Sequence, residues 1–217
     1  MLRATAQRLL AAASKGRAPA AGRAFSGAAQ FDPFNPTEEH QMLRDTVRSF
    51  AVEEVDPQRL EHDREEKFNY ELFKKCGDLG LLGVTTDTEY GGSGMDATAA
   101  CIVHEELSQA DPGFCLAYLA HSMLFVNNLN QNGSHDQKSR FLPGACSGEL
   151  VGGMGMSEPN AGTDVLGLTT TAKKDGDDYI LNGGKMWITN GHMGNGETGD
   201  VYLVYARTGG AGAGGIS

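Results

Sequence analysis

The sequence lacks the features that mark several classes of protein. It has no run of eighteen apolar residues, so it offers no candidate transmembrane helix. Its four cysteines have no C-x-x-C spacing, which removes the basis for a zinc or dithiol motif and indicates free thiols. His104-Glu105 begins a possible zinc-binding helix, but Ser108 stands where that pattern needs a second histidine. We therefore predict no metal site.

Acidic residues are missing from the first thirty positions. This stretch carries five Lys or Arg residues and no Asp or Glu, which leaves −15 for the remainder of a chain whose total charge is −10. A basic, Ala-rich leader that also contains serine is typical of a mitochondrial transit peptide, which we assign to residues 1–28. We expect the mature protein in the mitochondrial matrix. Its acidic body argues against nucleic-acid binding.

Residues 36 to 148 show a helical pattern. Capping residues open three of the expected helices: Thr37, Asp96, and Asp111, which is followed by a proline. We expect helices over about 37–56, 70–79, 96–110, 111–132 and 135–142, with Pro57 ending or kinking the first and Pro143 stopping the last. Gly92 to Ala97 fits a G-x-G-x-x-A dinucleotide pattern, but a polar stretch precedes it and helices follow, so we reject that interpretation.

From Leu150 onward, β-branched and aromatic residues alternate with turn signals. We expect strands over about 150–156, 168–174, 179–181, 186–189 and 201–206. Helices followed by strands indicate an α+β fold, with a helical N-terminal domain over 32–148 and a β domain over 149–217. Four or five strands form only an incomplete barrel or sandwich with an open edge and face, so we expect the fold to be completed by further chain.

One stretch, Gly155 to Gly167, stands out as a strand that ends in a polar, sharply turned loop. Such a loop directs backbone N–H groups and small hydroxyls at one spot, which suits an anion such as a pyrophosphate. It lacks the Gly-Lys-Ser/Thr ending of a Walker A loop. On these residues alone, a polar turn between two strands is as good an interpretation as a ligand loop.

The same stretch, Met156-Ser157-Glu158-Pro159-Asn160-Ala161-Gly162-Thr163-Asp164, resembles the first signature of the acyl-CoA dehydrogenases. Lys185-Met186-Trp187-Ile188-Thr189-Asn190-Gly191 resembles a second motif of that family at the family's spacing. The resemblance runs from Pro36 to Ser217 and lacks the family's C-terminal helical bundle. It implies an FAD enzyme that removes two hydrogens from the α and β carbons of an acyl-CoA. Electron-transfer flavoprotein as acceptor and a homotetrameric full-length form are implied as well.

The resemblance also implies site residues. FAD would be bound by Met154, Gly155, Met156, Ser157, Ala161, Gly162, Thr163, Trp187, Ile188 and Thr189. Trp187 would pack against the flavin ring, Thr189 would donate toward flavin N5, and Thr163 would also contact the substrate's pantetheine arm. The glutamate that removes the α-proton is expected beyond Ser217, so no catalytic residue is assigned, and Glu158 is expected to be structural. Residues 1–217 alone are therefore expected to be inactive.

Within the family, Ala120-His121-Ser122 and the Met156–Gly162 stretch look most like members that act on isovaleryl-CoA in leucine catabolism. No Lys or Arg lies between Asp111 and Gln137 to meet a second carboxylate, which disfavours a glutaryl-type substrate. Three alternatives stay open: a non-catalytic flavin- or CoA-binding fragment, another short-chain acyl-CoA dehydrogenase, and an acyl-CoA oxidase. His121, in the fourth helix, is predicted to be packed and neutral.

Overall fold

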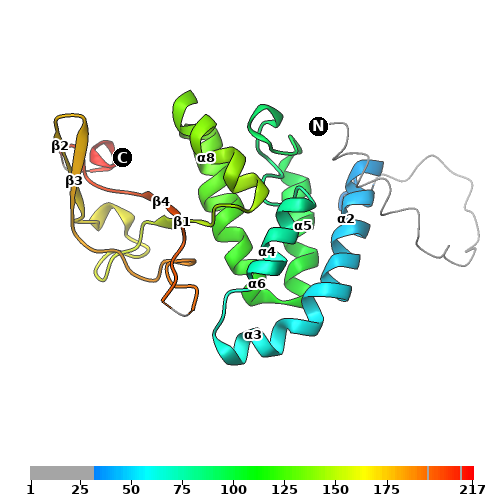
Figure 1. Cartoon of the computed structure of the whole chain (residues 1–217). Helices are drawn as coiled ribbons and strands as arrows, with labels where there is room; N and C mark the ends of the chain where they lie inside the picture. Colours follow the sequence, from blue (N-terminus) through cyan, green and yellow to red (C-terminus); the bar gives the residue numbers. More distant parts are fainter. Residues whose placement is uncertain (1–31, 195, 211) are drawn as a thin grey trace, which may run out of the picture.

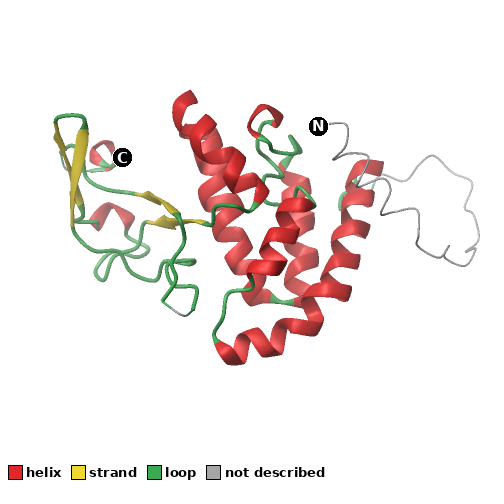
Figure 2. Ribbon diagram, in the orientation of Figure 1, coloured by secondary structure: helices red, strands yellow, loops and turns green. Residues whose placement is uncertain are grey.

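The computed structural model describes residues 32–194, 196–210 and 212–217. The predicted transit peptide, residues 1–28, lies outside this part of the chain. A group of packed helices comes first and a smaller region of strands and loops follows it (Figures 1 and 2). This order confirms the α+β prediction. Within the described residues, no helix combines the length and the apolar character needed to cross a membrane.

The predicted caps begin the helices where expected. The Thr37 hydroxyl accepts the His40 N–H before α2, and the Asp96 and Asp111 carboxylates cap α5 and α6 in the same way. The α-helices are α2 (Glu38–Phe50), α3 (Arg59–Glu65), α4 (Tyr70–Asp78), α5 (Ala97–Ala110), α6 (Pro112–Leu119), α7 (Asn128–Asn132) and α8 (His135–Ser147).

The structure interrupts the regular α-helix at Pro57, in agreement with the predicted end or kink, but it does not stop the last helix at Pro143. At Pro57 the chain stays helical, passing from α2 through a π-helical segment, Ala51–Val55, and a 3-10 turn, Asp56–Gln58, into α3. Pro143 lies inside α8 and does not end it. Leu142 and Ala145 on either side of this proline are fully buried, and their burial offsets the backbone hydrogen bond that proline cannot make.

The fourth predicted helix is also interrupted. Between α6 and α7 the chain forms a π-helical segment, Ala120–Asn127, whose wider turns shift the buried face. Leu116, which simple helical spacing directs inward, is 55% exposed, whereas Tyr118 and Phe125 are buried.

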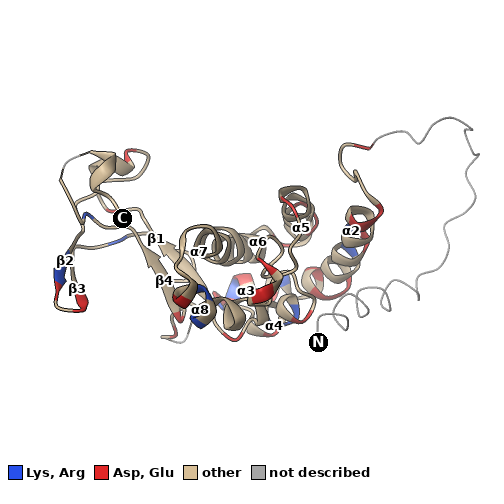
Figure 3. Ribbon diagram, turned by 90° about the horizontal axis from the view of Figure 1, so that it is seen from above, with Lys and Arg blue, Asp and Glu red and all other residues tan. Residues whose placement is uncertain are grey.

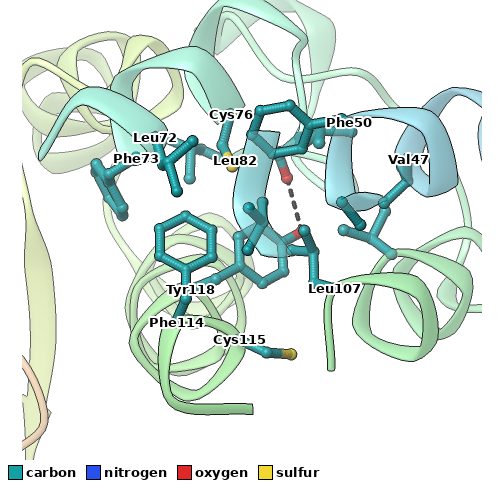
Figure 4. Close-up of a cluster of buried hydrophobic side chains, with 14 of the residues drawn as sticks. Val47, Phe50, Leu72, Phe73, Cys76, Leu82, Leu107, Phe114, Cys115 and Tyr118 are labelled. Atoms are coloured by element: carbon teal, nitrogen blue, oxygen red, sulfur yellow. Dashed lines mark hydrogen bonds between the residues drawn. The ribbon is translucent and has the colours of Figure 1, made fainter. Parts of the chain in front are cut away.

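The helical core lies between α2, α4, α5 and α6 (Figure 4). Tyr118 is fully buried there, and its hydroxyl donates to the Leu81 carbonyl at 2.8 Å. On the α2–α5 contact, the buried Glu106 carboxylate accepts from Arg44 at 2.6 Å and from Arg48 at 2.8 Å. Large apolar side chains and the Glu106 charge cluster therefore hold the helices of this region together.

The β region contains two small sheets. Strands β1 (Gly152–Gly155) and β4 (Val201–Val204) pair in parallel, with Gly152 opposite Val201. Strands β2 (Thr171–Asp175) and β3 (Asp178–Asn182) form an antiparallel hairpin that stands away from the helices in Figure 1. Its turn holds Gly176 at φ 62°, in the left-handed region that favours glycine. The described residues form no closed barrel.

His121 joins the two regions. It is fully buried; its Nε2 donates to the Ala145 carbonyl at 3.0 Å, and its Nδ1 accepts the Gly152 N–H at 2.9 Å. Burial lowers the His121 pKa to about 4, because the protonated ring would be poorly solvated, although the bond to Ala145 acts in the opposite direction. The prediction of a packed, neutral histidine is confirmed, and this ring ties β1 to the helices.

Candidate functional site

The two sequence motifs come together because residues 185–190 run antiparallel beside β1 and the loop that follows it. The Asn190 side-chain amide donates to the Gly152 carbonyl at 2.9 Å. A side chain at Gly153 would come within 2.8 Å of the Thr189 carbonyl oxygen, so glycine permits this close approach. Further along, the Met186 N–H donates to the Ser157 carbonyl at 2.9 Å. Segments about thirty residues apart in sequence therefore form one site.

The predicted strand over residues 186–189 is not formed, although the segment lies where a third strand would pair with β1. Trp187 has φ 57°, in the left-handed region, which breaks the regular ladder after the Met186 bond. This backbone turn leaves the Trp187 side chain 79% exposed. Trp187 is thus not a core aromatic of a strand, which is the ordinary role of tryptophan in a sheet.

Glu158 lies at the centre of the loop and is only 4% exposed. Its carboxylate accepts from the Thr169 N–H at 2.7 Å, the Thr170 N–H at 2.9 Å and Lys185 Nζ at 2.9 Å. Burial acts to raise the Glu158 pKa, but these donors outweigh it and lower the pKa well below its usual range. The carboxylate is ionised and fully engaged, as a structural group would be.

The loop after Glu158 makes a tight turn and then opens outward. The Glu158 N–H donates to the Ala161 carbonyl at 2.9 Å, and the Ala161 N–H returns to the Glu158 carbonyl at 3.1 Å. The next N–H groups, those of Gly162, Thr163 and Asp164, have no acceptor among the described residues. A Cβ at Gly162 would meet nothing within 4 Å. The loop therefore presents unused backbone donors to its surroundings.

The structure places every predicted site residue in this region. Met154 and Gly155 lie on β1, Met156 and Ser157 begin the loop, and Ala161 is buried beneath it, while Gly162 and Thr163 are exposed. Trp187, Ile188 and Thr189 form the neighbouring segment. Among the described residues no hydrogen bond connects Thr163 with that segment, so the loop tip is not bonded directly to the segment that carries the indole.

Two contributors were not assigned a role from the sequence. Lys185 partners Glu158, and Asn190 holds the second motif on β1. The role of Lys185 could have been inferred from Glu158. A glutamate with a structural role inside a loop needs donors that compensate its charge, and Lys185 is a basic residue of the second motif. No comparable signal existed for Asn190, whose partners are backbone carbonyls far away in sequence.

The chemistry of these donors fits a dinucleotide cofactor. Unused backbone N–H groups beside the Thr163 hydroxyl suit a diphosphate, which is bound through several convergent donors. The exposed Trp187 ring suits a planar heterocycle that can stack on it and keep water away. The hydroxyls of Ser157 and Thr189 form no hydrogen bond with other described residues, and so both are free to bind a ligand.

Comparison with known proteins gives a consistent family. The acyl-CoA dehydrogenase N-terminal domain matches residues 37–149, and the acyl-CoA dehydrogenase middle domain matches residues 153–217. The mitochondrial isovaleryl-CoA dehydrogenase of Pongo abelii is 44% identical over 215 residues, covering 94% of this chain and 50% of that protein. The chain thus spans about half the length of that relative.

Solved structures agree with this assignment. A chain in a structure of the electron transferring flavoprotein of Acidaminococcus fermentans has 36% identity and a TM-score of 0.75, covering 82% of this chain and 46% of that one. The FAD complex of PigA has 27% identity and a TM-score of 0.78, covering 86% and 48%. Members of the matched family use FAD. With both domain matches falling on the helical region and the site region described above, the chain belongs to the acyl-CoA dehydrogenase family.

Proposed function

We propose that this chain forms the FAD- and acyl-CoA-binding part of a mitochondrial matrix dehydrogenase for a short branched acyl-CoA. Isovaleryl-CoA is the proposed substrate, electron-transfer flavoprotein the acceptor, and a homotetramer the form of the whole protein. The observation that carries the proposal is the hydrogen-bonded assembly of the two motifs, with Met186 on Ser157 and Lys185 on Glu158.

The proposed organisation follows the described elements. A helical N-terminal domain spans residues 32–148 and a central β domain residues 149–217, behind a transit peptide at residues 1–28. In support, α8 ends at Ser147 and β1 begins at Gly152, so the boundary falls between them. The name of the mitochondrial relative supports the proposed compartment.

Each site residue has a proposed task. Gly162 and Thr163 bind the FAD diphosphate through their free N–H groups, and the Thr163 hydroxyl also contacts the substrate's pantetheine arm. Met154, Gly155, Met156, Ser157 and Ala161 form the wall beside the ring system, while Trp187, Ile188 and Thr189 cover it. In support, Gly162, Thr163 and Trp187 are the exposed members of this set, and the others are half-buried or buried.

FAD, when bound, supplies the hydride acceptor for the β-carbon of the substrate. The Thr189 and Ser157 hydroxyls donate toward the ring, where negative charge develops during reduction. Trp187 excludes water from that face. Glu158 is unsuited to take the α-proton, because its carboxylate is buried against Lys185 and three donors of Thr169 and Thr170. Proton removal is therefore assigned to no residue described here.

The proposed acyl group is small and uncharged. In support, Lys and Arg are absent from residues 111–137, which contain α6 and α7, so these helices offer no cation for a second carboxylate. The similarity to an isovaleryl-CoA dehydrogenase points in the same direction.

The test uses Trp187, which is the chain's single tryptophan. Titrating the purified protein with FAD should quench its fluorescence saturably, since the cofactor would stack on an exposed indole. Thr163→Val should weaken FAD binding by about tenfold, the size of one hydrogen bond to a charged group. Ser108→Ala, at an exposed position on α5, is the control. Fluorescence that declines without saturating would contradict the proposal.

A second titration tests the substrate. With FAD present, isovaleryl-CoA should perturb the flavin absorbance at lower concentration than a long straight-chain acyl-CoA. The opposite preference would leave the flavin site standing and overturn the choice of acyl group.

A further inference from the structure

We infer that Lys185 is a positioning residue: its ammonium group, paired with buried Glu158, holds the two flavin-contact segments in register. We call the set Met156, Glu158, Thr169, Thr170 and Lys185 the clasp. The inference rests on the proposed function and deepens it, because it assigns the group on which the site geometry depends.

Lys185 reaches across from the second motif to the first. Its Nζ lies 3.0 Å from the Met156 carbonyl and 2.9 Å from Glu158 Oε1, and its side chain is only 12% exposed. One ammonium group therefore binds the main chain and the side chain of the same loop. Exposed lysines seldom hold a geometry of this kind. The conformational entropy lost when four rotatable bonds are fixed outweighs the stabilisation from a solvated ion pair.

Glu158 extends the clasp to a third segment. Its Oε2 accepts from both the Thr169 N–H and the Thr169 hydroxyl, and its Oε1 accepts from the Thr170 N–H. The pair thus joins residues 156–158, 169–170 and 185. If Lys185 lost its charge, a buried carboxylate would remain without a counter-ion, which is costlier than removing both charges together.

The clasp residues are adjacent in sequence to the groups that face the proposed ligand. Lys185 precedes Met186, whose N–H binds Ser157, and Trp187 follows with its left-handed backbone. On the loop side, Gly162 and Thr163 lie just beyond the Glu158–Ala161 turn and make no hydrogen bond with other described residues. The relative position of the exposed indole and the exposed loop donors therefore depends on the Lys185–Glu158 pair.

Replacing Lys185 by methionine removes the charge and keeps the side-chain length. We expect Lys185→Met to weaken FAD binding at least about tenfold, measured by quenching of Trp187 fluorescence. Glu158→Gln combined with Lys185→Met should bind FAD more tightly than Lys185→Met alone, since no uncompensated charge remains. The matched control is Lys174→Met, at an exposed position on β2, and this variant should bind FAD as the unchanged protein does. Figure 3 shows the basic colour on the strand β2 of the hairpin.

A second readout needs no FAD. In the unliganded protein, Lys185→Met should shift the ¹⁵N indole resonance of Trp187, whereas Lys174→Met should not, and far-UV circular dichroism should report intact helices in both. If the unchanged protein fails to bind FAD, the proposed function falls, and the indole shift still decides the inference about the clasp.

Two outcomes overturn the inference. One is a folded Lys185→Met protein with FAD affinity within twofold of the original and an unmoved indole resonance. The other applies if Lys185→Met does not fold. In that case the FAD affinity of the double variant is compared with that of the unchanged protein. A folded double variant with FAD affinity within twofold of that of the unchanged protein and an unmoved indole resonance would show that the pair does not set the geometry.

Discussion

At the scale of single residues, His121 shows how one side chain can connect two regions and respond to pH. Both ring nitrogens are used, one by the Ala145 carbonyl and one by the Gly152 N–H, so the ring must stay neutral to accept the second bond. Protonation would convert Nδ1 from an acceptor into a donor facing another donor. The bond to β1 would then be lost.

This arrangement predicts acid sensitivity. The His121 pKa is about 4 in the folded protein and 6.5 for the ordinary group, so the unfolded chain binds the extra proton first as pH falls. The free energy of unfolding should therefore decrease between pH 6.5 and 4, by up to about 3 kcal/mol. Urea unfolding at several pH values measures it. His121→Gln should reduce the dependence of the free energy of unfolding on pH, whereas His192→Gln, at an exposed position, should not. The same pH dependence in all three proteins would contradict the argument.

Gly152 is a second residue whose identity the packing fixes. A Cβ there would lie 2.0 Å from a carbon of the Phe125 ring, so Gly152→Ala forces the ring or β1 to move. We expect a loss of about 1–3 kcal/mol in the free energy of unfolding. Gly162→Ala is the matched control, since its Cβ would meet nothing within 4 Å. A Gly152→Ala protein as stable as this control would mean that the contact relaxes without cost.

At the scale of elements, α8 contains a proline in its interior. Pro143 is exposed on the outer side of the helix, so its ring contributes little burial while it removes one helical hydrogen bond. Pro143→Ala should raise the free energy of unfolding by about 2 kcal/mol, because the interior-helix penalty of proline exceeds its restriction of the unfolded chain. Pro112→Ala, at the first turn of α6, should give no such gain, and thermal melting of both variants compares them.

The elements that sequence predicts well are those with local causes. The caps at Thr37, Asp96 and Asp111 each act within three residues, and their helices begin where expected. Long-range packing decided the rest. The π-helical segment Ala120–Asn127 interrupts the predicted fourth helix, and the parallel pairing of β1 with β4 joins residues almost fifty positions apart, which no local pattern encodes.

The candidate site divides in the same way. Its two segments could be found from their residue types, and the structure places them against each other. The left-handed turn at Trp187 could not be predicted, because Met-Trp-Ile-Thr has the composition of a strand. The pairing of Lys185 with Glu158 could not be predicted either, because the two residues are far apart in sequence and the same carboxylate is also bound by the Thr170 N–H.

At the scale of the whole molecule, Asn190 holds the β region on the helices. Its side-chain amide donates to the Ala117 carbonyl of α6 at 3.2 Å and to the Gly152 carbonyl of β1 at 2.9 Å. Its own carbonyl accepts from the Gly199 N–H and the Tyr202 hydroxyl. One buried residue therefore joins a helix, two strands and the second motif, and it adopts φ 64°, which asparagine tolerates better than most residues.

Asn190→Asp should separate the stability of the two regions. Aspartate fits the same space and backbone conformation, but it cannot donate to the two carbonyls and places a charge among acceptors, so we expect a loss of about 1–3 kcal/mol confined to the β region. Two probes distinguish the regions: fluorescence of Trp187 follows the β region, and far-UV circular dichroism follows the helices. In urea, the fluorescence transition should move to lower concentration while the dichroism transition stays nearly in place. Asn132→Asp, an exposed residue with only local bonds to Asn128, should move neither. If both transitions of Asn190→Asp move together, the helical and β regions unfold as one cooperative unit, and Asn190 stabilises the whole of it.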